Sequence, residues 1–244
     1  MNRNVTFPAV SITGLNLRLA WASAEILADR TEDVQILVAG DARDVSELRI
    51  QQEKNQLTIE QPNYGLSMKL NSERWLEIFI RVPRSWKGSI QGGSISGKLT
   101  ARGLIGTDLS LESTSGDIRT TNTSFMTTSV KTVSGNIELS APECEQLTLR
   151  TVSGNVAVSS GNALKLQLSA VSGDSVIKLV NVPEQVEGNT VSGQVVLQAP
   201  IEAADASLRS VSGRMLTENV SIREGATRVA FASVSGHLIL HSTR

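Results

Sequence analysis

The stretch Thr132-Val133-Ser134-Gly135-Asn136-Ile137-Glu138-Leu139 decides the fold, because it returns almost unchanged over residues 151–158. Looser copies precede and follow it, and each contains a Ser-Gly pair. Successive pairs are separated by 19, 19, 19, 19, 20, 20 and 23 residues. A narrow period of this kind is the sequence signature of stacked repeats. The eight pairs are Ser96-Gly97, Ser115-Gly116, Ser134-Gly135, Ser153-Gly154, Ser172-Gly173, Ser192-Gly193, Ser212-Gly213 and Ser235-Gly236.

Each repeat is interpreted as two short strands joined by a corner. The residue after the glycine is polar in every copy, and the next residue is apolar in seven copies. Elsewhere in the repeat, apolar and polar residues alternate, which is typical of half-buried strands. The apolar parity shifts once, between Leu149 and Val152. This shift predicts a bend at the Ser-Gly pair, where glycine tolerates positive φ. A second corner is expected in a variable loop such as 159–163, 141–145 or 181–187.

These features predict an all-β fold. The expected architecture is a single-stranded parallel β-solenoid, similar to a β-helix or β-roll, of about eight 19–20-residue rungs with an irregular N-terminal β cap. One such unit cannot bury its apolar face alone, but stacked units can. At the usual spacing between strands, eight rungs make a rod roughly 40 Å long. The predicted parts are an N-terminal β cap or set of early irregular rungs (1–90) and a Ser-Gly repeat solenoid (91–244).

The first 90 residues carry strand patterns without the Ser-Gly pair. Apolar and polar residues alternate over 15–19, 34–38, 57–59 and, most strongly, 75–82. The best helix candidate is 21–30, because of its alanine content. Its spacing also suits a strand, and its surroundings favour the all-β interpretation. We expect this part of the chain to cover the first rung, since natural proteins usually cover open strand edges.

The composition excludes several classes of function. Lys plus Arg is 23 and Asp plus Glu is 24, giving a net charge of −1, so no basic excess exists to hold nucleic acid or an anionic membrane. Aromatic residues make up 3%, too few for base-stacking platforms or the aromatic floors of sugar sites. Cys144 is the only cysteine, which fits a reducing compartment. With neither a signal-peptide pattern nor an apolar run of membrane-spanning length, the sequence predicts a cytoplasmic protein.

The Thr-Val-Ser-Gly-Asn-Ile/Val repeats resemble those of the bacterial putative-adhesin β-strand-repeat family, a domain of unknown function with Val-Ser-Gly repeats. Residues 55–60 (Asn-Gln-Leu-Thr-Ile-Glu) and 76–83 (Leu-Glu-Ile-Phe-Ile-Arg-Val-Pro) resemble it as well. The likeness extends from about residue 12 to residue 241. It implies a β-solenoid-like fold and no established activity. Because many relatives look membrane-anchored or sit beside envelope-stress genes, it also implies association with the cell envelope.

The polar residues that follow each corner glycine form a column, which we call the polar column. This column could be interpreted as a cation site, but its spacing does not suit one. Asp117, Asn136, Asn155 and Asp174 supply one oxygen-bearing side chain per rung, whereas calcium requires six to eight clustered oxygens. We interpret the column as a solvated polar ladder. Asp117 and Arg119 are a minimal start toward a carbohydrate-cleaving site, but no further charged residues gather around them in the sequence.

The remaining reactive side chains do not form a recognisable site either. His237 and His241 share a parity on one strand, but no third metal ligand is evident. Cys144 is expected in a loop beside Glu143 and Glu145, whose charges should raise the pKa of its thiol and make it a poor nucleophile. The sequence therefore predicts no catalytic, cofactor-binding or metal-binding residues.

The leading hypothesis is a non-enzymatic scaffold without cofactors, which presents a polar face and loops to a protein partner or an envelope component. A second hypothesis is self-assembly into a dimer or filament, because no sequence remains after the last rung to cover its strand edge. The edge residues would be His237, Ile239 and His241. A third hypothesis, a carbohydrate-active β-helix enzyme, rests on fold analogy alone.

Overall fold

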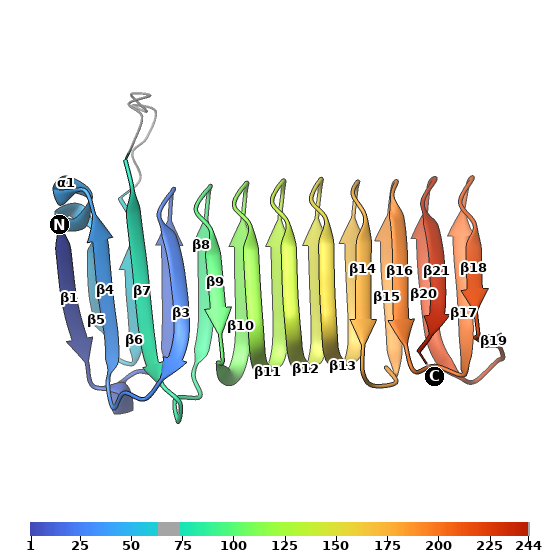
Figure 1. Cartoon of the computed structure of the whole chain (residues 1–244), viewed down its shortest axis with the longest axis horizontal. Helices are drawn as coiled ribbons and strands as arrows, with labels where there is room; N and C mark the ends of the chain where they lie inside the picture. Colours follow the sequence, from blue (N-terminus) through green and yellow to red (C-terminus); the bar gives the residue numbers. More distant parts are fainter. Residues whose placement is uncertain (63–73, 244) are drawn as a thin grey trace.

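The computed structural model describes residues 1–62 and 74–243. The chain winds into a long rod made of two β-faces that lie back to back (Figure 1). We call them face 1 and face 2, and each complete rung supplies one strand segment to each face. The Ser-Gly corners join the two faces along one edge of the rod.

Most of the strand pairing along both faces is parallel. Face 1 contains, in spatial order, β5 (Arg49–Glu53), β6 (Gln56–Glu60), β2 (Gly14–Leu19), β8 (Ser89–Ser94), β10 (Ile105–Ser113), the second halves of β11 (Ile118–Thr132), β12 (Ile137–Thr151) and β13 (Val156–Ala170), β15 (Gln185–Thr190), β20 (Thr227–Ser233), β17 (Ala203–Ser210) and the short β19 (Ser221–Ile222). Face 2 contains β1 (Asn2–Phe7), β4 (Val34–Gly40), β7 (Leu76–Pro83), β3 (Ser23–Asp29), β9 (Leu99–Arg102), the first halves of β11, β12 and β13, β14 (Ser175–Leu179), β16 (Gln194–Ala199), β21 (His237–Ser242) and β18 (Met215–Glu218).

The central strands β11, β12 and β13 are long because each passes from face 2 to face 1 without a break. Asn122, Ala141 and Ser160 stand at this passage, with φ angles of 51°, 49° and 53°. The prediction of a loop over 141–145 and 159–163 is therefore wrong, since both segments lie within strands. A single left-handed residue in each rung, an uncommon conformation outside glycine, accompanies the bend.

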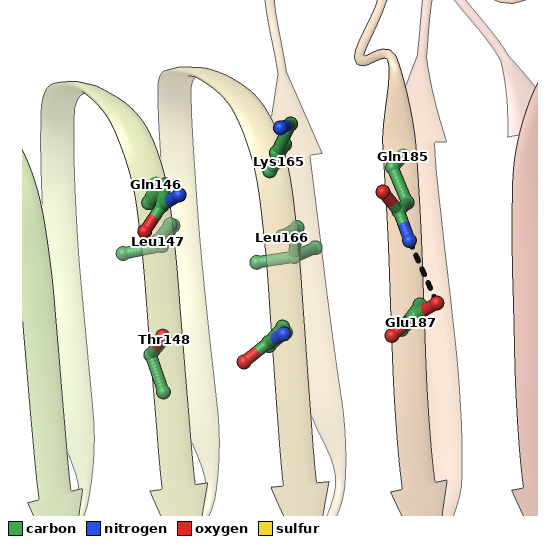
Figure 2. A pocket seen from close by; sticks show the side chains of 8 residues that line it. Gln146, Leu147, Thr148, Lys165, Leu166, Gln185 and Glu187 are labelled. Carbon is green, nitrogen blue, oxygen red and sulfur yellow. Dashed lines mark hydrogen bonds between the residues drawn. The ribbon is translucent and has the colours of Figure 1, made fainter.

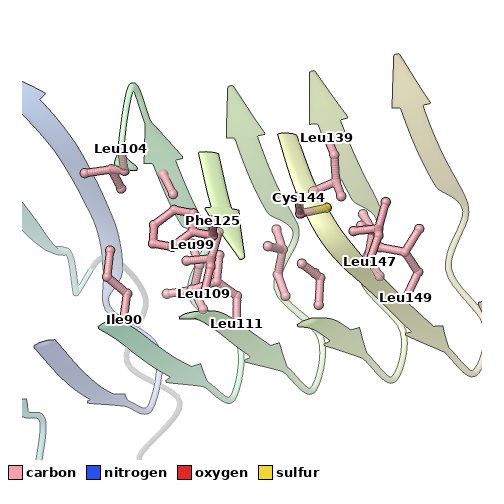
Figure 3. Packing of buried hydrophobic residues seen from close by; sticks show 14 of the residues in the cluster. Ile90, Leu99, Leu104, Leu109, Leu111, Phe125, Leu139, Cys144, Leu147 and Leu149 are labelled. Atoms are coloured by element: carbon pink, nitrogen blue, oxygen red, sulfur yellow. The ribbon is translucent and has the colours of Figure 1, made fainter. Parts of the chain in front are cut away.

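The core is a narrow apolar layer between the two faces. Leu139 from face 2 and Leu147 and Leu149 from face 1 all point into this layer, and each of the three is at most 1% exposed (Figure 3). Burying one such leucine contributes about 2 kcal/mol of hydrophobic stabilisation. The alternation of apolar and polar residues thus produces the rod directly, because every second side chain of a strand points into this layer.

Two phenylalanines fill space that glycines in the neighbouring rungs leave open. Phe125 pairs in register with Gly106, and Phe231 with Gly188. A Cβ atom on Gly188 would lie 2.0 Å from Cε1 of Phe231. The glycines are therefore required for the rings to fit in the narrow core.

At the N-terminal end, the rungs follow a different order in space than in the sequence. β2 pairs with β6 on one side and with β8 on the other, while β3 pairs with β7 and β9. The rung formed by residues 14–29 thus lies between two later rungs. The pairs β1–β4, β4–β7 and β5–β6 are antiparallel. The prediction of a purely parallel solenoid is therefore too simple, because the sheet is mixed.

The C-terminal end has a similar exchange. β20 lies between β15 and β17, and β21 lies between β16 and β18. The prediction that His237, Ile239 and His241 form an open edge is wrong, since all three belong to β21, which has neighbours on both sides. The edge of the rod at this end is formed by β17 and β18.

Burial explains why the last rung of the sequence takes an inner position. Its inward residues are large and apolar: Phe231, Leu238 and Leu240 are 4%, 1% and 3% exposed. The outer rung contributes smaller or less buried residues such as Ala206 and Met215. Exchanging the two rungs would expose more apolar surface to water, at roughly 25 cal/mol per Å².

Two short helical segments occur where the sequence predicts none. They are η1 (Ala9–Ser11) and α1 (Ala42–Glu47), and α1 packs against β1 and β4 and buries Val45. The segment 21–30 contains β3, so the all-β interpretation of this segment is confirmed. Across the described residues, no helix has both the length and the apolar character needed to cross a membrane.

Candidate interaction surfaces

The Ser-Gly corners are held by a repeating set of hydrogen bonds. The N–H of Gly154 donates to Oγ1 of Thr151 at 2.9 Å, within its own corner. The hydroxyl of Ser153 donates to the carbonyl of Val133, one rung away, at 3.2 Å. The same two bonds recur at most corners, so the small polar residues of the motif link each rung to the one before it.

Close stacking explains the glycine at most corners. A Cβ atom on Gly154 would lie 1.9 Å from the carbonyl oxygen of Gly135, which is far inside van der Waals contact. Of the eight corner glycines, only Gly173 and Gly193 have positive φ, at 103° and 109°. The expectation that glycine is needed for positive φ is therefore wrong at the other six corners, where the neighbouring rung occupies the space of a side chain.

The polar column has a structural role in addition to its exposure. Oδ1 of Asp117 accepts a hydrogen bond from the backbone N–H of Asn136 at 3.0 Å, and Oδ1 of Asn136 accepts one from the N–H of Asn155 at 3.1 Å. Oδ1 of Asn155 and of Asp174 continue the series to the next two rungs. The column therefore satisfies backbone donors at the corner, where the ladder of the sheet is interrupted.

An exposed apolar line runs beside these corners, which sequence reasoning missed. The residue before each corner serine is aliphatic in seven of eight rungs and points outward, with 44% to 84% of its surface exposed. The shift in apolar parity before each Ser-Gly pair could have revealed this exposure. Neighbouring residues of a strand point to opposite sides, so the residue after a buried threonine such as Thr132 must face water. We call this line the corner ridge, and its members are Ile95, Val133, Val152, Val171, Val191, Val211 and Val234.

Face 1 presents a flat polar surface over β12, β13 and β15, which we call the polar face. Gln146, Lys165 and Gln185 lie in one row across the three strands, and Thr148, Gln167 and Glu187 lie in the next. In Figure 2, Gln146, Thr148, Lys165, Gln185 and Glu187 lie on the outside, while Leu147 and Leu166 point the other way, into the core. Nε2 of Gln185 donates to Oε1 of Glu187 at 2.7 Å. A shallow hollow of about 90 Å³ lies between the rows.

The histidines are brought close to polar residues of the outer rung. Nδ1 of His237 accepts a hydrogen bond from the N–H of Arg214 at 3.2 Å, and Nδ1 of His241 lies 2.9 Å from Oε2 of Glu218. Ile239 stands between them in the sequence and pairs in register with Leu216. These residues join β21 to β18. Among the described residues, no three His, Cys, Asp or Glu side chains gather as a metal site would require.

Asp117 and Arg119 do approach one another, with 3.9 Å between Oδ2 and Nη2. Arg119 makes a shorter contact with Glu138 of the next rung, 2.8 Å from Nε to Oε2. All three side chains are between 38% and 48% exposed. They lie on an open face, so the arrangement is that of a solvated ion-pair network.

Cys144 lies in β12 rather than in the predicted loop, and it is 8% exposed. Burial raises the pKa of its thiol from 9.0 to about 11. A side-chain hydrogen bond with Thr128 lowers this pKa, and the charge of Glu143 raises it. The main cause is therefore desolvation, and the carboxylate that the sequence suggested contributes less.

We expect Cys144 in the folded protein to resist alkylation by iodoacetamide between pH 7 and 9, because the thiolate is the reactive form. The thiol ionises near pH 9 when unfolded and near pH 11 when folded. Its contribution to stability is thus present below pH 9 and is lost as the pH rises toward 11. Mass spectrometry of timed reactions tests this, with Ser140→Cys on the exposed side of β12 as the control. Equal rates at the two positions would contradict the expectation.

Comparisons with known proteins agree with this architecture. One solved structure, described as a putative adhesin from Parabacteroides distasonis ATCC 8503, matches with a TM-score of 0.62 and 11% identity over 98% of this chain and 97% of that chain. A second, described as a putative lipid binding protein from the same strain, matches with a TM-score of 0.61 and 14% identity over 97% and 96%. A third, described as a putative adhesin from Bacteroides fragilis NCTC 9343, gives 0.56 and 15% over 98% and 97%.

At these identities the likeness concerns the fold alone. A search of curated proteins found no match to the chain. The family model described as Toastrack DUF4097 matches residues 12–237. The chain therefore belongs to the Toastrack DUF4097 family, a putative-adhesin β-repeat family of unknown function.

Proposed function

We propose that this protein is a non-enzymatic scaffold whose polar face binds a protein partner of extended shape. The observation that carries the proposal is the arrangement of hydrogen-bonding side chains in rows across β12, β13 and β15. Adjacent members of a row are separated by the spacing between strands, about 4.8 Å. A partner segment lying along the rod therefore meets a new donor or acceptor at every rung.

The shape of the surface favours a macromolecule over a small ligand. The polar face has a hollow of about 90 Å³ between Gln146, Lys165 and Gln185 and a second of about 410 Å³ between Thr148, Gln167 and Glu187. Both are lined mostly by polar residues, whereas pockets for small molecules are usually lined mostly by apolar side chains. With aromatic residues at 3% of the chain, a protein partner is also favoured over a sugar that stacks on rings. The fold neighbours described as putative adhesins support a role in contact with other molecules at the cell surface.

A crosslinking experiment tests the proposal. A photo-crosslinking amino acid replaces Gln167 on the polar face, or Gln198 on face 2, in the cells that produce the protein. We expect Gln167 to yield protein adducts that Gln198 does not. The double variant Lys165→Glu/Gln185→Glu should reduce those adducts by about tenfold, as loss of about 1.4 kcal/mol of binding energy would do.

The chain offers a matched control for this variant. Lys178 and Gln198 are neighbours on face 2, just as Lys165 and Gln185 are neighbours on face 1. Lys178→Glu/Gln198→Glu should leave the adducts of Gln167 unchanged. Equal adducts from both faces would refute a specific polar face. A glycan- or peptide-cleaving activity that Asp117→Asn removes would refute the non-enzymatic assignment.

A further inference from the structure

We propose that a second copy of this chain docks at the open C-terminal end of the rod, tail to tail about a two-fold axis. In this dimer, β17 pairs antiparallel with its counterpart on face 1, and β18 does the same on face 2. The proposal concerns the end of the rod and does not depend on the polar face.

The end of the rod leaves strand edges without a partner. β17 pairs with β20 on its inner side, while on its outer side β19 covers only Ala203 and Ala204. β18 pairs with β21 alone. Arg223, which follows β19, still donates to the carbonyl of Ala204. Within the described part of the chain, the outer edges of residues 206–210 and 215–218 therefore have no strand beside them. At the opposite end of the rod, β1 and β5 are also edge strands, but α1 packs there and buries Val45 over the core.

The same end exposes apolar surface. Ala206, Leu208 and Met215 pack on the core but are only partly buried. In a central rung, Leu149 takes the place that corresponds to Leu208, and it is 0% exposed. Leu216 and Val211 are 52% and 84% exposed. An exposed strand edge with apolar side chains is a template for pairing with another chain.

The sequence of β17 is self-complementary in charge. With Ser207 on the two-fold axis, antiparallel pairing sets Asp205 of one copy opposite Arg209 of the other, and the symmetry repeats this contact. Ser210 of the second copy then takes the place of the two-residue β19 beside Ala204, so β19 is displaced in the dimer. Ala206 then faces Leu208 on the inner side. Opposite charges across antiparallel strands stabilise the pair, and like charges destabilise it.

β18 has the same property with the signs reversed. With Leu216 on the axis, Arg214 of one copy faces Glu218 of the other, and the two exposed Leu216 side chains meet. Glu218 contacts His241 through Oε2, which leaves Oε1 for the arginine. Ser207 lies four residues before Val211, and Leu216 lies four residues after Ser212, at the corner between the strands. A single two-fold axis that passes through both faces can therefore relate both β17 and β18 to their counterparts in the second copy.

The direction of the backbone groups agrees with this register. On the outer side of β17, the carbonyl of Ala204 accepts from the N–H of Arg223 at 2.9 Å. Because successive residues of a strand point these groups to opposite sides, Ala206 and Leu208 also point theirs outward. The carbonyl of Arg214, just before β18, accepts from the N–H of Leu238 on the inner side, so the backbone groups of Met215 and Thr217 point to the outer edge.

The proposed register pairs these outward groups with one another. Ala206 is set opposite Leu208, and Met215 opposite Thr217, as hydrogen-bonded pairs. The axis residues Ser207 and Leu216 form the non-bonded pairs between them. The charge pattern and the backbone directions are independent observations, and both select the same alignment.

Light scattering behind a sizing column, over a range of protein concentrations, tests the dimer. We expect the mass to approach twice 26.1 kDa and to stop there, since an isologous contact closes after two copies. Asp205→Arg and Arg209→Asp should each raise the dissociation constant at least about tenfold, because like charges then face each other twice. The double variant Asp205→Arg/Arg209→Asp should restore the dimer.

A matched control is Asp108→Arg, an exposed aspartate in the same row of face 1 but distant from the end. It should leave the dimer intact. A monomer at every concentration would overturn the proposal. So would a dimer that the two single variants leave unchanged, a double variant that fails to restore pairing, or a polymer that grows with concentration.

Discussion

Replacing Phe231 with alanine is expected to lower the stability of the protein by about 3–5 kcal/mol, which is the usual cost of emptying a phenylalanine site in a core. Phe231 is 4% exposed and lies beside Gly188, which has no side chain to fill the resulting space. The neighbours cannot collapse easily, because the strands on either side are held by backbone ladders. We expect the midpoint of thermal unfolding to fall by about 10 °C or more for a chain of this length.

Phe79→Ala is the matched control for this substitution. Phe79 stands on the outward side of β7 and is only partly buried. The same chemical change should therefore cost on the order of 1 kcal/mol there. Circular dichroism during heating compares the two variants. Equal losses would show that the space beside Gly188 is not tightly filled.

Replacing Gly154 with alanine is expected to cost about 2–3 kcal/mol, because it overpacks the corner. The new methyl group would lie 1.9 Å from the carbonyl oxygen of Gly135. That atom belongs to the backbone of the neighbouring rung, so relief requires the two rungs to separate. We expect thermal unfolding to begin about 5 °C or more below that of the unaltered protein.

Gly93→Ala, in strand β8, provides the comparison. The nearest atom to a Cβ at this position is the carbonyl oxygen of Leu17, at 3.7 Å, which is an ordinary contact. Alanine should be accepted there with little change or a small gain in stability, because it restricts the unfolded chain. If Gly93→Ala lowered the stability as much as Gly154→Ala, the cause would be backbone entropy and not the close contact between stacked rungs.

The repeat unit could be predicted from the sequence because it depends on local alternation. Leu147, Leu149 and Val156 alternate with polar residues, and the structure leaves each of them at most 1% exposed. Every second side chain of a strand points to the same face, so this pattern alone separates inward from outward positions. The family resemblance rested on the same local motif.

The order of rungs at the two ends could not be predicted, because it depends on contacts far apart in the chain. Each rung presents the same alternation and the same backbone groups to its neighbours. Nothing in the periodicity distinguishes residues 203–218 from residues 227–242 as the outer rung. The difference lies in packing, such as the fit of Phe231 beside Gly188, which becomes apparent only in three dimensions.

The candidate surfaces were only partly predictable for a related reason. The polar column was recognisable, but its bonds to the next rung depend on the vertical register of the stack. The outward direction of Val133 and Val152 was hidden because valine is commonly a core residue. Their exposure follows from the corner, which reverses the usual relation between apolar character and burial.

The exchanged rungs at both ends have a mechanical consequence. In a rod whose rungs followed the order of the chain, a pulling force at the terminus would break the hydrogen bonds between one pair of strands at a time. Here β21 is clamped between β16 and β18, and β2 is clamped between β6 and β8. Pulling on β21 must therefore separate two ladders together, whereas β1, which precedes β2, pairs with β4 alone. A rod built in this way resists peeling at β21 more strongly than at β1.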